Sequence, residues 1–483
     1  MHKLLVFGLV TILLASSILA IPASAADDIV AADFSKPSWS KNIDLLDYVR
    51  RHAEAIDGTP PPATWSSDLV VNYVNQRGVK LLYMGFGGVD FGEAKYQLPL
   101  QSLVERFNTT EGDEAITAST FLMLMAFNDT SKSKYPGSPD LGDNLWASFT
   151  IGSDISKEIK GVAPKIHSTV QTTPLSSSAD GSEWTWGMSY RDLAAIWWKV
   201  GSDAKILPVA FCTYDELSFS YRLVYGADGS AKLYISYTIG AIRDLWTIGY
   251  LGFIPVVYRY NDTGSYRYNQ KIGSQTAHDF LTTNKISMSI IMAQRTWVAG
   301  KQTLNKVNGG PVSDGVELSN GGVQTSTQSG AKVLDVSFAE KHGYTLGVPS
   351  GDKSYDAVTR TANVEFYTAG PVLKVQGSLL WYANALMAHM FPAKYAQQAK
   401  IWMNATKSDY LYITSYPTYG GYKVVNDPVI TAYSPAPKVN SGGGVPIPIE
   451  GIVIGALVAT AIIFGWRRKA KTLEAPNSSF KAK

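Results

Sequence analysis

The sequence predicts a mainly β protein: a large β-sandwich-like ectodomain with a few helices, followed by one C-terminal transmembrane helix. Three observations support this prediction. Apolar and polar residues alternate on both sides of an Asp-Gly turn within residues 217–239, which is typical of a β-hairpin. Strand-like runs separated by Gly- and Pro-containing turns fill much of the remaining chain. One long apolar segment lies near each end.

The N-terminal segment has the three parts of a secretory signal. Lys3 precedes an apolar run from Leu4 to Ile21, Pro22 ends that run, and Ala23-Ser24-Ala25 supplies the small residues of a cleavage site. An uncleaved membrane helix is the alternative, but Pro22 would break such a helix at its end. We therefore predict that residues 1–25 are a signal peptide that is removed.

The C-terminal segment predicts a membrane anchor. Residues 445–466 form an apolar run whose single ionisable side chain is Glu450, and about 20 apolar residues in a helix span the bilayer core. Trp466 and a basic cluster behind it are typical of the cytoplasmic side. The cluster comprises Arg467, Arg468, Lys469 and Lys471. We expect a single-pass type I protein of the cell membrane, with an extracellular ectodomain and residues 467–483 as a basic cytoplasmic tail.

Small residues recur at four-residue spacing inside this anchor, at Gly451, Gly455 and Ala459. Such spacing lets two membrane helices approach closely, so self-association through the anchor is one hypothesis. Because glycines are common in membrane helices, an anchor that does not self-associate is the favoured interpretation.

Charge separates the ectodomain from the tail. The whole chain has a net charge of +3, while the tail from Arg467 onwards carries six basic residues and one acidic residue. Lys3 adds one further positive charge, so residues 26–466 are left with a net charge of roughly −3. The basic isoelectric point therefore reflects the anchor, and we predict no nucleic-acid partner.

Cys212 is the single cysteine, so a disulfide within the chain is excluded. Disulfide-rich secreted modules of animals are therefore disfavoured, and a prokaryotic surface protein, archaeal-like, fits better. A nucleophilic role for Cys212 needs an electropositive neighbourhood. A small buried hydrophobe is the favoured interpretation.

Glycosylation is the other modification that the sequence suggests. Four Asn-x-Ser/Thr triplets lie in the expected ectodomain, at Asn108, Asn128, Asn261 and Asn404. Each is an acceptor only in a host that glycosylates. Because such triplets also arise by chance in a chain of this length, we treat them as candidate sites.

We expect two ectodomain lobes separated by a linker. Residues 26–306 form the first β-rich lobe, residues 307–330 a Gly/Ser/Asn-rich linker or loop, and residues 331–433 the second β-rich lobe. Residues 434–444, rich in Ser, Pro and Gly, are predicted to be a flexible stalk above the membrane.

Within the first lobe, apolar residues at three-to-four spacing predict a helix over 40–57, with Ser40 as its N-cap. Residues 98–107 and 114–127 are compatible with helix or strand. Residues 245–258 are uncharged but too short to span a bilayer, and their glycines and proline favour buried strand and turn. The other predicted first-lobe strands are 79–84, 147–151, 217–225 and 233–239.

The second lobe is predicted to contain more strands than helices. A helix pair broken at Pro392 is expected over residues 381–403. The predicted strands are 362–367, 372–375, 410–414 and 422–425.

Three kinds of residue pattern are candidates for a metal-, phosphate- or calcium-binding site. The isolated histidines show no metal-binding spacing, and we predict no metal or cofactor. Gly85-Phe86-Gly87-Gly88 weakly resembles a phosphate-binding loop, but a turn or a bulge is favoured. Acidic clusters could hold calcium, although a solvated surface is the favoured interpretation. These clusters are Glu111–Glu114, Asp140–Asp143 and Asp314–Glu317.

Aromatic residues are the most distinctive feature. Trp184, Trp186 and Tyr190 alternate on one strand face, and Trp197 and Trp198 follow. Exposed rings at these positions would bind a ligand by stacking against sugars or a partner protein. The alternative, which we favour, is that this face is the inner side of a β-sandwich.

These observations lead to one principal functional hypothesis. We expect a non-enzymatic surface protein for binding or adhesion, with surface glycans or other surface proteins as partners. An alternative is a membrane-tethered polysaccharide hydrolase that uses a carboxylate pair such as Asp90 and Glu93. A second alternative is a structural component of a surface coat.

Overall fold

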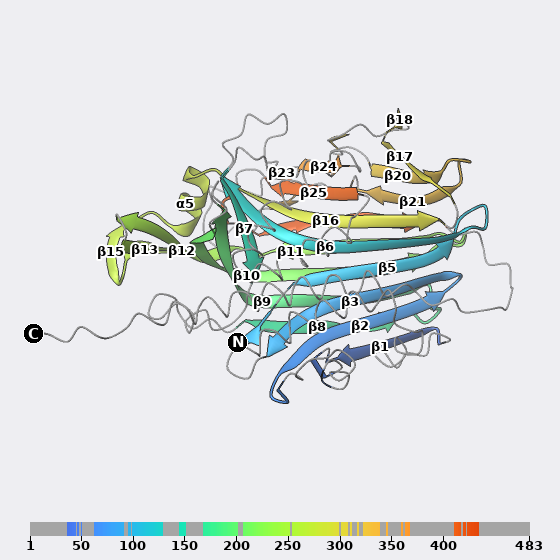
Figure 1. Cartoon of the computed structure of the whole chain (residues 1–483), viewed down its shortest axis with the longest axis horizontal. Helices are drawn as coiled ribbons and strands as arrows, with labels where there is room; N and C mark the ends of the chain where they lie inside the picture. The colour runs from blue at the N-terminus through green and yellow to red at the C-terminus, as the bar shows by residue number, and fades with distance from the viewer. Residues whose placement is uncertain are drawn as a thin grey trace, which may run out of the picture.

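The computed structural model confirms a mainly β protein (Figure 1). The residues that it describes are 36–44, 46–47, 50, 62–90, 95–97, 99–128, 144–150, 168–200, 206–251, 254–298, 301–307, 310–311, 316–317, 322–338, 344–345, 359–360, 363–367, 410–416, 419–421 and 423–433. All strand pairs among them are antiparallel, and the strands are accompanied by the helix α5 (Ala277–Thr283).

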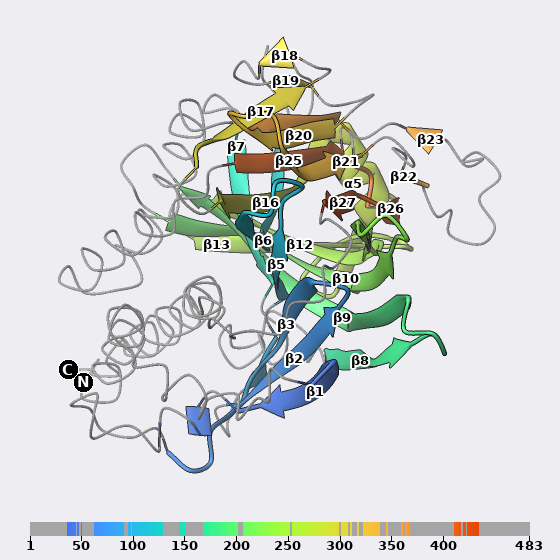
Figure 2. The ribbon, with the colours of Figure 1, turned by 90° about the vertical axis from the view of Figure 1, so that its right-hand side faces the viewer.

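The strands form two packed layers. The first layer contains β1 (Ser38–Ile43), β2 (Ser66–Gln76), β3 (Val79–Asp90), β4 (Lys95–Tyr96), β5 (Leu100–Asn108), β6 (Glu114–Asn128), β16 (Ile286–Val298), β25 (Tyr410–Tyr416), β24 (Asn363–Tyr367) and β19 (Val316–Glu317). The second layer contains β8 (Thr169–Ser177), β9 (Glu183–Val200), β10 (Ile206–Tyr225), β11 (Ala231–Ile239), β26 (Val424–Asn426), β27 (Val429–Ala432), β21 (Lys332–Ser337), β20 (Gly322–Thr327), β17 (Thr303–Val307) and β18 (Gly310–Pro311). Figure 2 shows β1 to β3 and β8 to β9 running beside each other in the two layers.

Two further groups of strands complete the topology. The strand β7 (Asn144–Thr150) pairs with both β6 and β9 and so joins the two layers by hydrogen bonds. A lateral extension leaves β10 through β12 (Ile242–Leu251), β13 (Ile254–Asn261), β14 (Gly264–Arg267) and β15 (Gln270–Gly273). A separate two-stranded sheet contains β22 (Tyr344–Thr345) and β23 (Thr359–Arg360).

The hairpin of β10 and β11 confirms the alternation seen in the sequence. Leu217 pairs with Ile239 and Tyr225 with Ala231, without a register shift between them. The turn is closed by Asp228, whose carboxylate accepts hydrogen bonds from the backbone N–H and the hydroxyl of Ser230 at 3.0 and 2.6 Å. Period-two patterning on both arms, together with a turn of defined length, sets the register.

Aromatic side chains from both layers fill the space between them. The Trp186 ring stacks on Tyr221 with centroids 5.4 Å apart, and the Tyr83 ring of the first layer lies 5.0 Å from Tyr221 of the second. Phe121 lies 5.3 Å from Phe219 in the same way. This interleaving identifies the interlayer space as the hydrophobic core.

Several ambiguous segments are resolved as strands. Of these segments, residues 100–107 and 114–127 fall on β5 and β6, and residues 245–251 and 254–258 on β12 and β13. The glycines of Gly85–Gly88 lie inside β3, opposite a register shift at Asp68/Leu69, so of the predicted turn or bulge the structure shows the bulge. A Cβ atom at Gly85 would overlap the Tyr83 hydroxyl group, which shows why the packed tyrosine requires glycine there.

The predicted start of the first helix is wrong. Ser40, expected to be its N-cap, lies in β1 and pairs with Asn72 of β2. The ladder with β2 overrides the three-to-four apolar spacing at this point, because it satisfies backbone groups that a helix start leaves open. Helical residues are described at Leu46, Asp47 and Arg50.

Several expectations lie outside the described residues. These are the signal peptide 1–25, the helix pair 381–403, the stalk 434–444, the anchor 445–466 with Gly451, Gly455 and Ala459, and the tail 467–483. Among the residues that the structure does describe, no helix is sufficiently long and apolar to cross a bilayer.

Strand ladders run across the expected linker at residues 307–330. The strand β20 lies inside this stretch and pairs with β17 on one side and β21 on the other. The strands β25 and β27 of the expected second lobe pair with β16 and β11 of the expected first lobe.

Candidate binding surface

The side of β9, β10 and β11 that faces away from the core is the best-defined polar surface in the described structure. Successive residues of a strand point to opposite sides, and the residues between the core aromatics form this outer face. Its members are Glu183, Thr185, Gly187, Ser189 and Arg191 of β9, Glu216, Ser218, Ser220, Arg222 and Val224 of β10, and Lys232, Tyr234, Ser236 and Thr238 of β11.

The centre of the outer face carries hydroxyl groups and no charge. Ser189, Ser218 and Thr238 stand in one row across the three strands, because each pairs with the next in register. The adjacent row contains Gly187, Ser220 and Ser236. The Ser189 oxygen is buried without a hydrogen-bond partner in the described structure. Because neighbouring strands lie about 4.8 Å apart, the hydroxyl groups of Ser218, Thr238, Ser220 and Ser236 form a regular array of hydrogen-bond donors and acceptors.

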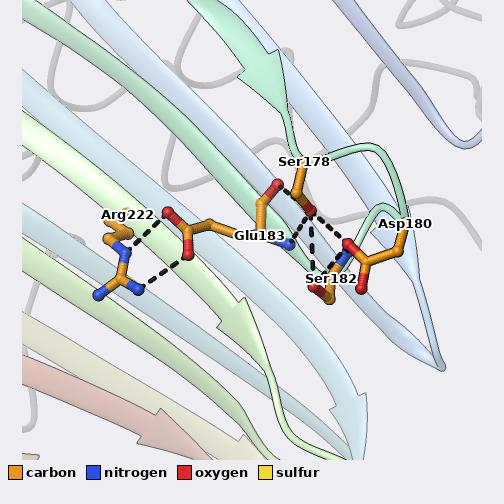
Figure 3. Close-up of polar contacts among 5 residues, drawn as sticks. All are labelled: Ser178, Asp180, Ser182, Glu183 and Arg222. Atoms are coloured by element: carbon orange, nitrogen blue, oxygen red, sulfur yellow. Dashed lines mark hydrogen bonds and ion pairs between the residues drawn. The ribbon is translucent and has the colours of Figure 1, made fainter.

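An arginine and a glutamate border the hydroxyl rows at one end (Figure 3). The guanidinium of Arg222 donates from Nε and Nη2 to the two carboxylate oxygens of Glu183, at 2.8 Å each. The same guanidinium lies 5.3 Å from the centroid of the Tyr234 ring. Hydrogen bonding to Arg222 lowers the pKa of Glu183, and the same bond raises the pKa of Arg222. Both groups therefore remain charged.

Beyond this pair, the turn between β8 and β9 holds an ordered carboxylate. The side chain of Asp180 accepts hydrogen bonds from the hydroxyls of Ser178 and Ser182 at 2.6 and 2.8 Å, and from the backbone N–H of Ser182 (Figure 3). These bonds, with the hydroxyl of Ser178 contributing most, lower the pKa of Asp180 to about 2. The turn thus presents a fixed negative charge next to the outer face.

Ion pairs also border the opposite end. Arg191 contacts Glu216 at 2.8 Å, and Arg243 contacts Asp215 at 2.8 Å. The outer face is therefore an uncharged hydroxyl surface with paired charges at both ends.

The predicted stacking residues do not form such a surface. Trp184, Trp186, Tyr190 and Trp197 are 7, 1, 0 and 0% exposed and belong to the core, so none of them offers a ring to a ligand. The side chain of Trp198 lies outside the described residues. The favoured interpretation, in which this face is the inner side of a β-sandwich, therefore describes these four residues.

Trp186 and Trp197 are both buried, although a regular strand would point residues of even and odd number to opposite faces. The phase of the alternation changes at Asp192, which has a φ of 51°. The register against β10 stays the same here, with Arg191 opposite Glu216 and Leu193 opposite Tyr214. The phase of β10 changes at the same place, because Tyr214 and Leu217 are both buried.

A buried carboxyl group was not predicted. Glu105 of β5 is 2% exposed, and neither of its carboxyl oxygens has a hydrogen-bond partner in the described structure. Burial raises the pKa of Glu105 to about 8. The buried Tyr225 hydroxyl, which is also without a hydrogen-bond partner in the described structure, has a pKa raised first by burial and then by the charge of Glu105. In sequence, Glu105 stands before Arg106 and gives no sign of burial.

Cys212 is buried, as expected for a small core residue. Burial raises the pKa of its thiol, so the reactive thiolate is disfavoured. The favoured interpretation of Cys212 as a packing residue is confirmed.

The acidic cluster Glu111–Glu114 contacts basic side chains of the protein itself. The Lys301 ammonium lies 2.9 Å from Glu111 and 2.7 Å from Asp113, and Arg106 forms an ion pair with Glu114. Lys301 thus occupies the place that a cation would take. The cluster 140–143 lies outside the described residues, as do Asp314 and Gly315. Within the described part of the chain, no group of His, Cys, Asp and Glu side chains could hold a metal ion.

The remaining candidates are distributed over the surface. Asp90 is the last residue of β3, and its proposed partner Glu93 lies outside the described residues. Asn108 is exposed at the end of β5. Asn261 ends β13, and its side-chain oxygen accepts hydrogen bonds from the N–H and hydroxyl of Thr263 at 2.9 and 2.8 Å. The side chain of Asn128 and all of Asn404 lie outside the described residues.

Comparison with known proteins gives no family. No protein-family model matches the chain, and no curated protein matches it. The crystal structure of the Pichia pastoris lysyl oxidase aligns over 85% of this chain and 71% of that one, with 7% identity and a TM-score of 0.19. A similarity this low supports no argument about fold or function.

Proposed function

We propose that the chain is a single-span, membrane-anchored cell-surface protein that binds a glycan or another surface protein without chemical reaction. The outer face of β9, β10 and β11 is the observation that carries this proposal. It is polar and built on long, continuous strand ladders, so its hydroxyl groups hold fixed positions. Fixed donors and acceptors lose little entropy when they bind a ligand.

The chemistry of the outer face fits a glycan well. A serine or threonine hydroxyl both donates and accepts a hydrogen bond, as do the hydroxyls of a sugar. About half of the Arg222 side chain is exposed, at 51%. Its Nε and Nη2 groups keep their hydrogen bonds to Glu183. The guanidinium can therefore contact a ligand without losing its partner.

Anchoring is tested first, with the full-length chain and a chain that ends at residue 440. We expect the full-length chain to float with liposomes in a density gradient and the shortened chain to stay in solution. Protease added to intact cells should remove the ectodomain from the full-length protein. A full-length chain that does not float, or that resists protease on intact cells, contradicts the proposed anchoring.

Binding is tested with the full-length protein in detergent micelles on a glycan array. Ser220 is exposed at the centre of the outer face, so Ser220→Trp should reduce binding by at least ~10-fold, because bulk at the centre prevents close approach. Ser66→Trp, at an exposed position of β2 in the other layer, is the matched control and should bind normally. Equal binding by wild type and both variants would exclude the outer face as the ligand site.

A further inference from the structure

The hairpin of β14 and β15, residues 264–273, exposes two large apolar side chains. Tyr268 is 67% exposed and Ile272 51%. In the described part of the chain, the other exposed large apolar side chain is Leu304, at 43%. Two such side chains on one short hairpin form a concentrated apolar contact.

The backbone at Tyr268 is not explained by folding. Tyr268 has a φ of 53°, in the left-handed region where Asn or Gly is usual in a two-residue hairpin turn. Asparagine would fit this position better, and a largely exposed ring adds little to the core. A bulky residue kept in an unfavourable conformation indicates a role outside the fold.

The hairpin carries positive charge at two places. The Arg267 guanidinium lies 5.9 Å from the centroid of the Tyr268 ring, and the exposed Lys271 on the paired strand has its Cε atom close to Gly264, at the base of the hairpin. Between Asp262 and Asp279 the sequence contains no acidic residue. The hairpin therefore combines an aromatic ring, an apolar side chain and two cations, which together favour an anionic partner.

The hairpin is held in place by the neighbouring elements. Gly264 has a φ of 137° and lies so close to the carbonyl oxygen of Gly273 that a Cβ atom would overlap it. The Tyr266 hydroxyl lies 2.8 Å from the hydroxyl of Thr263. Tyr260 of β13 packs on Phe280 of α5 with centroids 4.6 Å apart. The contact surface is thus presented by a supported hairpin.

Strand pairing places the hairpin far from the residue that leads into the predicted stalk. Arg267 pairs with Tyr258, which pairs with Thr247, and Thr247 pairs with Ala210 of β10. Tyr433 directly follows Ala432, which pairs with Ala231 next to Tyr225 at the other end of β10. From Ala210 to Tyr225, β10 spans roughly 50 Å at about 3.3 Å per residue. Figure 1 shows β15 at one end of the molecule.

The predicted stalk limits how the protein can stand on the membrane. Residues 434–444 span at most about 40 Å when fully extended, and a flexible chain of that length averages about 18 Å. The end with Tyr433 is therefore kept near the proposed anchor, and the hairpin lies at the far end. Lipids of the protein's own membrane are consequently a poor match for the hairpin.

We propose that the β14–β15 hairpin is a membrane-distal contact that binds an anionic polysaccharide. Its orientation rests on the proposed anchoring at residues 445–466, whereas its chemistry rests on the hairpin alone. A stable protein interface uses about 20–30 residues on each partner, which is more than the ten residues of this hairpin. A ring and two cations instead match one or a few acidic sugar units, by stacking and by charge pairing.

The test uses full-length protein in detergent micelles and three kinds of bead. Polygalacturonate beads carry acidic sugars, dextran beads carry neutral sugars, and polyglutamate beads carry the same charge without sugar rings. We expect binding to polygalacturonate, weakened by salt, and little binding to dextran through the hairpin. Binding to polyglutamate should be weaker and independent of Tyr268.

Variants separate the ring from the charge. Tyr268→Asn removes the ring but favours the left-handed backbone, so it should fold at least as well as wild type and bind polygalacturonate at least ~10-fold more weakly. The double change Arg267→Gln and Lys271→Gln should have a similar effect. The matched control, Lys332→Gln with Lys423→Gln, removes the same charge from exposed positions elsewhere and should retain most binding.

Several outcomes of the bead measurements would overturn the proposal. If Tyr268→Asn binds like wild type, or if the control pair weakens binding equally, the hairpin is not the site. If polyglutamate binds as tightly and with the same dependence on Tyr268, the partner is an acidic peptide. Failure of the anchoring test, by contrast, removes the orientation and leaves these bead measurements valid. Loss of array binding in Ser220→Trp with unchanged polygalacturonate binding distinguishes the two surfaces.

Discussion

The two faces of β9, β10 and β11 are made from alternate residues of the same strands, yet they carry opposite chemistry. The inner face packs Trp186, Phe219 and Tyr221 against the first layer. The outer face carries serine, threonine and paired charges. Because inner and outer side chains alternate along each strand, adjacent positions should respond very differently to the same substitution.

This difference shows where stability and binding reside. The inner face contributes by removing apolar area from water, and it leaves nothing for a ligand to contact. The outer face contributes little to stability, since exposed ion pairs and hydroxyls exchange one hydrogen-bond partner for another. Substitutions on the outer face can therefore test binding without unfolding the protein.

The largest expected effect comes from truncating adjacent residues on the two faces. Trp186→Ala should lower the free energy of unfolding by about 3–5 kcal/mol, because it leaves a cavity between the layers. Thr185→Ala, one position earlier on the outer face, should change it by less than ~0.5 kcal/mol. Guanidinium denaturation measures both. Similar losses for the two variants would contradict the assignment of faces.

The second effect is a pH dependence that arises from a carboxyl group buried between the layers. The pKa of Glu105 is raised from 4.5 to about 8, so the folded state binds a proton that the unfolded state releases. This stabilisation is fully present below the unfolded pKa and is lost as the pH rises through the folded one. Between about pH 5 and pH 8, the free energy of unfolding should fall by about 1.4 kcal/mol per pH unit.

Glu105→Gln isolates this contribution, because the amide has nearly the same shape and does not titrate. Wild type and variant are compared by urea denaturation across the same pH range. The difference between their unfolding free energies should change with pH at the slope just given. Parallel curves for the two proteins would show that Glu105 does not titrate in this way.

The third effect compares substitution of a glycine in a crowded position with substitution of a glycine that has free space beside it. At Gly85 an added Cβ would overlap the Tyr83 hydroxyl and lie 3.0 Å from Met188 Cε, so Gly85→Ala should cost about 1–3 kcal/mol. At Gly249 the nearest atom, in Tyr258, would be at an ordinary 3.5 Å. Gly249→Ala should therefore be neutral or slightly stabilising. Thermal unfolding compares the two, and equal shifts would contradict the packing at Gly85.

The smallest effect is expected at the charged end of the outer face. Arg191→Gln removes an ion pair whose arginine side chain is 46% exposed, so it should lower the free energy of unfolding by less than ~1 kcal/mol. High salt should reduce the difference from wild type further, because salt screens exposed charges. A larger, salt-independent loss would show that the pair is structurally essential.

Some of the fold could be predicted because it depends on local pattern. The hairpin of β10 and β11 follows from alternation and an Asp-Gly turn, and the glycine cluster of β3 follows from the rarity of such clusters in regular strands. The segments that became β5 and β6 were ambiguous, because pairing with distant strands, and not propensity, decides such cases. The same long-range pairing placed Ser40 in β1.

The candidate surface was less predictable than the fold. The tryptophans were candidate ligand-binding residues because they are conspicuous in the sequence. Whether their side chains face the core depends on the layer that packs over them. Trp197 is buried only because the strand phase changes at Asp192. Serine and threonine on the outer face are ordinary residues in sequence and become an array only when three strands align them.

The sequence alone determined the mainly β class and the register of its central hairpin, because alternation and turn chemistry act between near neighbours. Tertiary structure alone decided that the phase of β9 changes at Asp192, that Glu105 is buried, and that Lys301 occupies the acidic cluster at Glu111. The physical reason is that burial and charge pairing depend on atoms brought together from distant parts of the chain. No local pattern encodes them.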